Sequence, residues 1–264
     1  MKTILEKLIA ALLAALPCLL QAQTNGAANL PPLETVLARA ADAAARESYY
    51  ETNFNRRYGF LHTRVNETRN SSGKLKKREE KFMTNSPPPA VASLPLPSYA
   101  SPTNGAAADP RKPSGKLIDV TDLTTNVLAH SHLTLVGRER LDGRSVLVID
   151  FKPPDRKVAE KDLIHRLINR VAGRAWMDEQ DSTLIKLEAH LVNRLNIFGG
   201  LIGAVLKGSY SFERKRTEDG LWYSRDVQWS ARIREVFFYR NLSSHEEIKD
   251  VHRPAATGVV TTTQ

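Results

Sequence analysis

The sequence predicts a mainly β fold (α+β), in which a strongly curved antiparallel sheet follows one N-terminal helix. Three observations predict it. Extended runs recur from residue 58 to residue 253, and polar turns with glycine separate several of them. One alanine-rich segment near the N-terminus has a helical apolar period. Short strands at regular spacing with turn signals between them are typical of a sandwich or a barrel.

The N-terminal helix is predicted over residues 33–46. Pro31 and Pro32 stand at its entrance, where proline is favoured, and alanine dominates the segment that follows. One apolar stripe at helical spacing is available for burial and consists of Leu33, Val36, Leu37 and Ala40. We expect this helix to pack on the sheet.

Hairpin signals place most of the strands. The polar turn from Asn70 to Gly73 separates extended runs at 58–68 and 75–84, and Asp142-Gly143 separates runs at 133–141 and 144–151. Further extended runs occur at 174–178, 184–191, 208–216, 222–233 and 236–253. The pattern predicts about nine or ten antiparallel strands in sequence order.

Residues 1–22 have the features of a cleaved secretion signal. Lys2 and Lys7 flank an apolar run that ends in Leu20-Gln21-Ala22, so we expect cleavage near Ala22. The single cysteine, Cys18, lies inside this segment, and Ala15-Leu16-Pro17-Cys18 is a poor signal for lipid attachment because proline replaces a small residue. An exported, periplasmic protein without disulfides is therefore predicted.

The rest of the chain, residues 23–264, is expected to form one domain. Residues 86–116 are rich in proline, alanine and serine and read as a loop inserted in that domain. The formal net charge is +9, which favours anionic partners. Export makes nucleic acid an unsuitable partner, whereas anionic lipid and peripheral membrane contact remain compatible with the charge.

Three motifs in the second half of the chain resemble one known family. They are Gly137-Arg138-Glu139-Arg140-Leu141-Asp142-Gly143-Arg144, Phe151-Lys152-Pro153 and Gly173-Arg174-Ala175-Trp176-Met177-Asp178. In this order they resemble the LolA/LolB-like periplasmic lipoprotein carriers, often named outer-membrane lipoprotein-sorting proteins. The resemblance covers roughly residues 133–253, with a weaker likeness over the N-terminal helix and residues 58–84.

The resemblance implies a half-open antiparallel β-barrel whose concave side is partly closed by helices and lined by apolar side chains. It also implies a non-catalytic carrier or chaperone for the acyl chains of lipids or lipoproteins. The alternative is a regulatory or scaffolding envelope protein that binds another protein through the same sheet. Strand alternation suggests a set of cleft-lining residues on one set of faces: Leu135, Val146, Val148, Trp176, Ile185, Leu187 and Phe212.

A second candidate is the glycine-rich apolar stretch at 197–206, which is too short to span a bilayer. A buried connection is the plainer interpretation, and a lid or membrane-touching loop formed by Phe198, Leu201 and Ile202 is the alternative.

No motif for chemistry accompanies these features. The histidines at 245 and 252 lack the four-residue spacing of a helical zinc site, and position 249 is a lysine. Neither a nucleophilic serine signature nor a phosphate-binding loop is present. The sequence therefore predicts no metal, no cofactor and no enzymatic activity.

Overall fold

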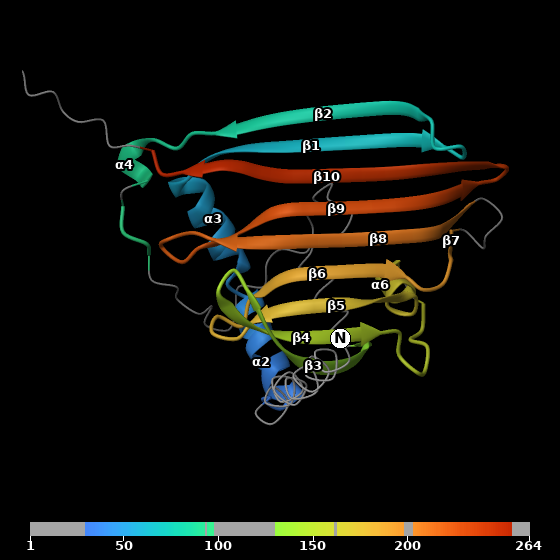
Figure 1. Ribbon diagram of the computed structural model, residues 1–264, viewed down its shortest axis with the longest axis horizontal. Helices are drawn as coiled ribbons and strands as arrows, with labels where there is room; N and C mark the ends of the chain where they lie inside the picture. Colours follow the sequence, from blue (N-terminus) through green and yellow to red (C-terminus); the bar gives the residue numbers. More distant parts are fainter. Residues whose placement is uncertain (1–29, 93, 98–129, 161–162, 198–202, 255–264) are drawn as a thin grey trace, which may run out of the picture.

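The structure is a computed structural model that describes residues 30–92, 94–97, 130–160, 163–197 and 203–254. Within these ranges it is one open, curved antiparallel sheet, with most of its helices toward one end of the strands (Figure 1). The predicted fold class is confirmed. The predicted signal peptide with Cys18, and residues 98–116 of the proline-rich segment, lie outside the described residues.

The strands follow each other along the sheet in nearly the order of the sequence. The path is β2-β1-β10-β9-β8-β6-β5-β4-β3, and β7 pairs with β8 beside it. Their bounds are β1 Gly59–Asn70, β2 Leu75–Asn85, β3 His132–Leu141, β4 Arg144–Lys152, β5 Val171–Asp178, β6 Leu184–Leu191, β7 Leu195–Ile197, β8 Gly203–Arg216, β9 Trp222–Glu235 and β10 Phe238–His252.

The predicted helix is present as α2, Leu33–Ala44, and it buries Val36, Ala40 and Ala43. A second helix follows directly as α3, Glu47–Arg57, and was not predicted. Phe54 anchors this helix on the sheet, because its ring stacks on Tyr223 of β9 with 4.4 Å between ring centroids. In Figure 1, α2 lies beside β3, β4 and β5, and α3 lies beside the longer strands β8 to β10.

Two short helices complete the described elements. The first, α4 (Pro89–Ala92), lies in the proline-rich segment, and the second, α6 (Leu163–Ile168), precedes β5. The described part of the proline-rich segment is tied to α3: Arg57 donates a hydrogen bond to the Leu94 carbonyl (2.6 Å) and Tyr49 donates one to the Pro97 carbonyl (2.7 Å). This start of the segment is therefore anchored by hydrogen bonds.

Strands β4 and β5 are buried on both faces. Four consecutive residues of β4, Val146 to Ile149, and four of β5, Ala175 to Asp178, are all buried. Successive side chains of a strand point to opposite faces, so something must cover each side of the sheet here. On one face α2 contributes Val36 and Ala40, and on the other Tyr50 of α3 and Trp222 contact the cluster around Trp176.

We predict that Gly173→Ala destabilises the fold by about 1–3 kcal/mol, because this site in β5 has no room for a methyl group. An added Cβ would lie 2.0 Å from the backbone oxygen of Glu188 and 2.6 Å from the Phe151 ring. The free energy of unfolding from chemical denaturation measures the effect. Gly137→Ala in β3 is the matched control, since an added Cβ there meets nothing within 4 Å. Equal stability of the two variants would contradict the packing.

Candidate functional site

The longer strands β1, β2 and β8 to β10 form the wide half of the sheet, and the shorter strands β3 to β6 form its narrow half. In the wide half the two faces of the sheet differ in chemistry. Residues paired directly across neighbouring strands lie on the same face. One row runs through Ala175, Leu187, Phe212 and Val227, and the row beside it through Ala189, Tyr210 and Trp229. Both rows begin in the core cluster that α2 covers. We call this side the helix face, and it is apolar from β5 to β9.

The opposite side is polar in the wide half, and we call it the serine face. Ser209 pairs with Ser230 and Ser230 with Ser243, while Ser211 pairs with Gln228 in the next row. A shallow groove of about 480 Å³ lies here. The sheet is therefore amphipathic, so an apolar ligand finds its surface on the helix face.

The seven predicted lining residues divide between the two faces. Leu135, Leu187 and Phe212 belong to the cluster under α2, whereas Val146, Val148, Trp176 and Ile185 belong to a second cluster with Trp222. Placing all seven on one set of faces was wrong. Leu187 pairs with Ala175 and not with Trp176, so Leu187 and Trp176 point to opposite faces. The register shift between Trp176 and Met177 leaves Ile185 of β6 unmatched in β5, and Ile185 lies in another cluster than Leu187 although the two are two residues apart.

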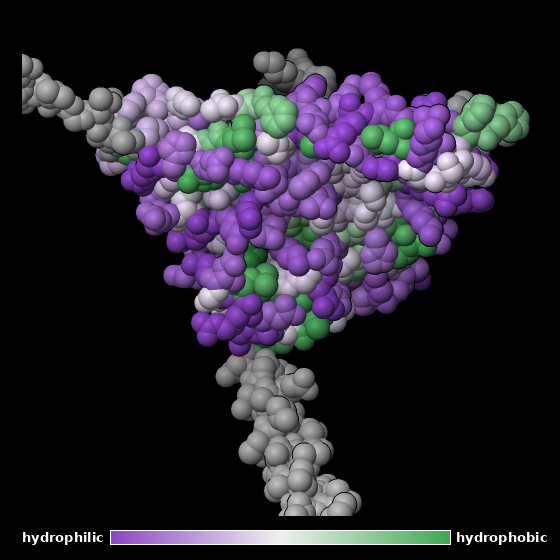
Figure 2. Space-filling model, turned by 45° about the horizontal axis from the view of Figure 1, so that its top comes forward, coloured by the Kyte–Doolittle hydropathy of each residue, from purple (hydrophilic) through white to green (hydrophobic). Residues whose placement is uncertain are grey.

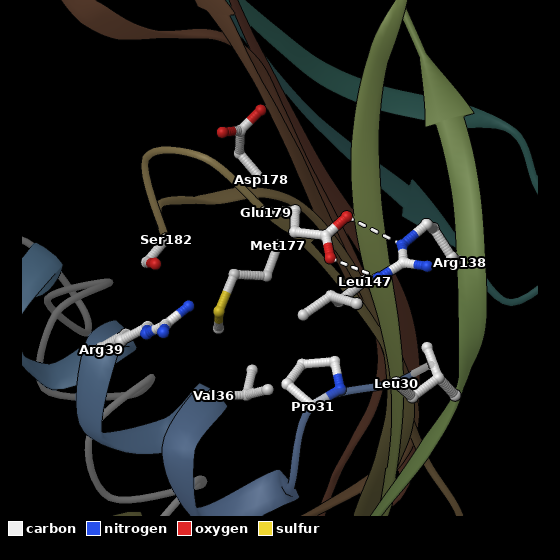
Figure 3. Close-up of a pocket in the computed structure, with 10 residues that line it drawn as sticks. All are labelled: Leu30, Pro31, Val36, Arg39, Arg138, Leu147, Met177, Asp178, Glu179 and Ser182. Carbon is white, nitrogen blue, oxygen red and sulfur yellow. Dashed lines mark hydrogen bonds and ion pairs between the residues drawn. The ribbon is translucent and has the colours of Figure 1, made fainter. Parts of the chain in front are cut away.

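A cavity of about 290 Å³ opens between α2 and the narrow half of the sheet. Its apolar part consists of Val36 from α2, Leu147 from β4 and Met177 from β5, together with Leu30 and Pro31. These side chains converge at the centre of the close-up (Figure 3). Of the predicted lining residues none contacts this cavity, but its floor belongs to the same cluster as Leu135, Leu187 and Phe212.

Charged groups form the rim of the cavity. Arg138 of β3 donates two hydrogen bonds to Glu179, at 2.8 and 2.5 Å, and these hydrogen bonds hold the pKa of the Glu179 carboxyl below its usual value. Arg39 approaches from the α2 side (Figure 3). Among the described residues Arg39 is exposed and has no ion-pair partner, so its guanidinium is available to an anionic group. The sequence analysis did not identify Arg39. Its one indication there was that Arg39 follows Val36 by three residues on the same helix, which makes the two side chains neighbours.

The turn between β5 and β6 is fixed beside the cavity by a polar network. Asp178 is 1% exposed and accepts two hydrogen bonds from Arg144, at 2.6 and 2.8 Å. The next carboxylate, Asp181, accepts from Arg144 and from the Trp222 indole, both at 3.1 Å. Burial alone would raise the pKa of Asp178, but the hydrogen bonds from Arg144 and from the backbone of Asp181 outweigh it, and the pKa is lowered. Asp178 is therefore an ionised structural group.

One cluster of possible metal ligands occurs on the serine face. Asp226, His245 and Glu247 place one ligand atom each within 4.8 Å of the others. His245 was considered from the sequence, and the register of β9 and β10 adds Asp226, which pairs with Glu247. His245 Nε2 lies 2.6 Å from an oxygen of Asp226, so a hydrogen bond between these two side chains already accounts for their approach.

The predicted lid residues Phe198, Leu201 and Ile202 lie outside the described residues. The strands that flank them reach the end of the sheet where β9 meets β10, because Ile197 pairs with Gly203 and Gly203 pairs with Glu235. None of the described helices is both long and apolar enough to cross a bilayer.

Comparison with known proteins gives structural likeness only. No protein-family profile matches the chain, and no curated protein matches it in sequence. Among solved structures, it is similar to a LolA superfamily protein from Nitrosomonas europaea, with 11% identity, coverage of 79% of this chain and 93% of that chain, and a TM-score of 0.28. It is also similar to a putative outer membrane lipoprotein-sorting protein domain from Vibrio parahaemolyticus, with 11% identity, coverage of 82% and 94%, and a TM-score of 0.29.

A third solved structure of this kind is a DUF1329 family protein from Desulfovibrio piger, with 9% identity, coverage of 82% and 92%, and a TM-score of 0.30. By their descriptions, the first two of these structures belong to the family that the sequence motifs resemble.

We predict that Asp178→Asn lowers the free energy of unfolding by about 2 kcal/mol at pH 7. A carboxyl whose folded pKa is depressed stabilises the fold above its unfolded pKa of about 3.9, and this contribution is lost as the pH falls through the folded value. The difference between variant and wild type should therefore shrink below about pH 4. Denaturation curves between pH 7 and pH 2 measure it.

The control for this experiment is Asp155→Asn, since the Asp155 side chain is 82% exposed. We expect it to change the stability by less than about 0.5 kcal/mol at every pH. A constant difference between Asp178→Asn and wild type across the pH range would show that the Asp178 carboxylate is not the stabilising group.

Proposed function

We propose that the protein is a periplasmic, non-catalytic carrier or chaperone that binds the acyl chains of lipids or lipoproteins. The observation that supports this most directly is the cavity under α2. It combines an apolar floor with the exposed guanidinium of Arg39 at the rim. An acyl chain needs a water-poor surface, with about 0.8 kcal/mol gained per buried methylene, and its acidic head group favours a cation.

The volume of the cavity limits the length of acyl chain that it can hold. A volume of about 290 Å³ lies at the lower limit of ligand pockets and holds only part of a long acyl chain. More apolar surface of the core cluster becomes available when α2 moves off the helix face. The contact residues of α2 are small: besides Val36 they are Ala40 and Ala43. Separating such a contact exposes less apolar area than separating a leucine-rich one, so α2 is suited to act as a cover.

We predict that the protein binds palmitate and that Arg39→Ala weakens this binding about fivefold, as expected for one ion pair at a partly exposed rim. Tryptophan fluorescence titration or calorimetry measures the dissociation constant. The methyl ester of palmitate, which lacks the charge, should not distinguish the variant from wild type.

Arg56→Ala is the matched control, because Arg56 is an exposed arginine of the neighbouring helix α3 and does not line the cavity. Mass spectrometry of lipids extracted from the purified protein gives an independent answer. A protein that carries no lipid and ignores palmitate would refute the proposal.

The alternative is a regulatory or scaffolding protein that binds an envelope protein partner through the same sheet. The observation that favours it is the edge strand β2, which is exposed along its length and displays Phe82 and Met83. Edge strands attract further strands, but charged residues protect against such pairing, and the run from Lys76 to Lys81 is entirely charged. A stable complex abolished by Phe82→Lys, without bound lipid, would favour this alternative.

A further inference from the structure

The most exposed apolar residues of the described chain lie at one hairpin tip. Glu235 pairs with Phe238, so Val236 and Phe237 form a two-residue turn between β9 and β10. Phe237 is 86% exposed and Phe238 71% exposed, and Val236 and Tyr239 beside them are exposed as well. We call Val236 to Tyr239 the aromatic tip. Figure 2 shows hydrophobic side chains gathered at the end of the molecule to which β9 and β10 extend in Figure 1.

The residue types of the aromatic tip are not those that a two-residue hairpin turn requires. Val236 has a φ of +50° at the first turn position, a conformation that glycine adopts without strain and that β-branched residues avoid. The turn between β3 and β4 shows the usual solution, with Asp142 and Gly143 at φ values of +48° and +79°. Strained backbone and exposed aromatic rings at one turn indicate a contact outside the hairpin.

Basic side chains surround the aromatic tip. Lys207 of β8 pairs with Arg232 of β9, and the Arg232 guanidinium lies 5.6 Å from the ring centre of Tyr239. Arg234 follows on β9, and Arg240 on β10 forms an ion pair with Glu235 at 3.2 Å. Glu235 is the one acidic residue on the described parts of β9 and β10 between Arg232 and Asn241.

The turn between β1 and β2 adds charge of the same sign at this end of the sheet. Asn70, the last residue of β1, pairs with Arg240, so this turn lies next to the base of the aromatic tip. Lys74, Lys76 and Lys77 follow in the turn and the start of β2, and all three are exposed. An apolar tip is thus set in a basic collar, defined here as Lys74, Lys76, Lys77, Lys207, Arg232 and Arg240.

We propose that the aromatic tip docks the protein on an anionic lipid bilayer surface. Phe237 and Phe238 enter the boundary between head groups and acyl chains, where aromatic residues are favoured, and the basic collar contacts the lipid phosphates. A protruding apolar tip can be buried in the interface of a fluid bilayer, because the lipids rearrange around it. The positive charge of the basic collar favours anionic lipid. This surface lies apart from the cavity under α2, so its role is independent of the proposed carrier function.

The test is vesicle flotation of the full-length chain with phosphatidylglycerol–phosphatidylcholine vesicles and with phosphatidylcholine vesicles. We expect binding to the anionic vesicles that weakens with salt. Replacing Val236→Gly together with Phe237→Asn should weaken it at least about tenfold. Because glycine suits the positive φ, the same variant should unfold at an equal or higher Tm than wild type, which separates loss of the tip from loss of the fold.

Two further variants complete the design. Phe82→Ser with Met83→Ser removes exposed apolar side chains from β2, away from the tip, and should leave vesicle binding unchanged. Arg232→Gln with Arg240→Gln should reduce both the binding and its salt dependence. Any binding contributed by the N-terminal apolar segment is common to all variants. Palmitate binding should not change in the tip variant, so the carrier proposal is tested separately.

The proposal is overturned if the tip variant binds anionic vesicles as well as wild type does. Equal binding to neutral and anionic vesicles would also overturn it. So would the absence of vesicle binding together with self-association that the tip variant abolishes, because the tip would then be an interface between copies of the chain.

Discussion

The contact between α2 and the sheet is the constraint on which the rest of the structure depends. Without Val36 and Ala40 in place, the apolar rows that start at Ala175 and Ala189 would face water along the narrow half. The same contact positions the cavity and Arg39 at its rim. The chain then continues directly into α3, where the stacking of Phe54 on Tyr223 connects the helices to the wide half. The two consecutive helices thus connect the narrow half of the sheet with its wide half.

The sequence predicted where most of the strands lie, but it did not predict the register in which they pair. Turn chemistry at Asn70–Gly73 and Asp142-Gly143 locates hairpins because these residues adopt the required φ values. Which faces coincide across strands depends on bulges, and no local pattern marks those at Trp176/Met177 or Leu135/Gly137. Trp176 was grouped with Leu187, although Leu187 pairs with Ala175 and the side chains of Trp176 and Leu187 lie in different clusters. The helix α3 was missed because its aromatic and asparagine residues have low helix propensity, and tertiary contacts of Phe54 decide its conformation.

The two surfaces of interest lie at opposite ends of the strands. The cavity adjoins the end of β5 and the start of β4, whereas the aromatic tip terminates β9 (Figure 1). Fourteen residues of β9 span about 45 Å. A molecule docked by its tip therefore holds the cavity away from the bilayer, on the side of the aqueous phase. Such an orientation suits an exchange with a soluble partner better than direct extraction of lipid from the membrane beneath the tip.

The topology also determines when the sheet can form. Strand β1 pairs over its length with β10, the last strand, so the hairpin β1–β2 joins the remaining strands only across the C-terminal one. Contacts between residues so distant in sequence make folding slow, since a large loop must close before they form. A chain emerging from a ribosome or a translocation channel cannot complete this sheet until residue 252 is free. The hairpin β1–β2 therefore stays separate from the other strands until the last strand of the chain is present, whereas β3 to β9 pair with one another without it.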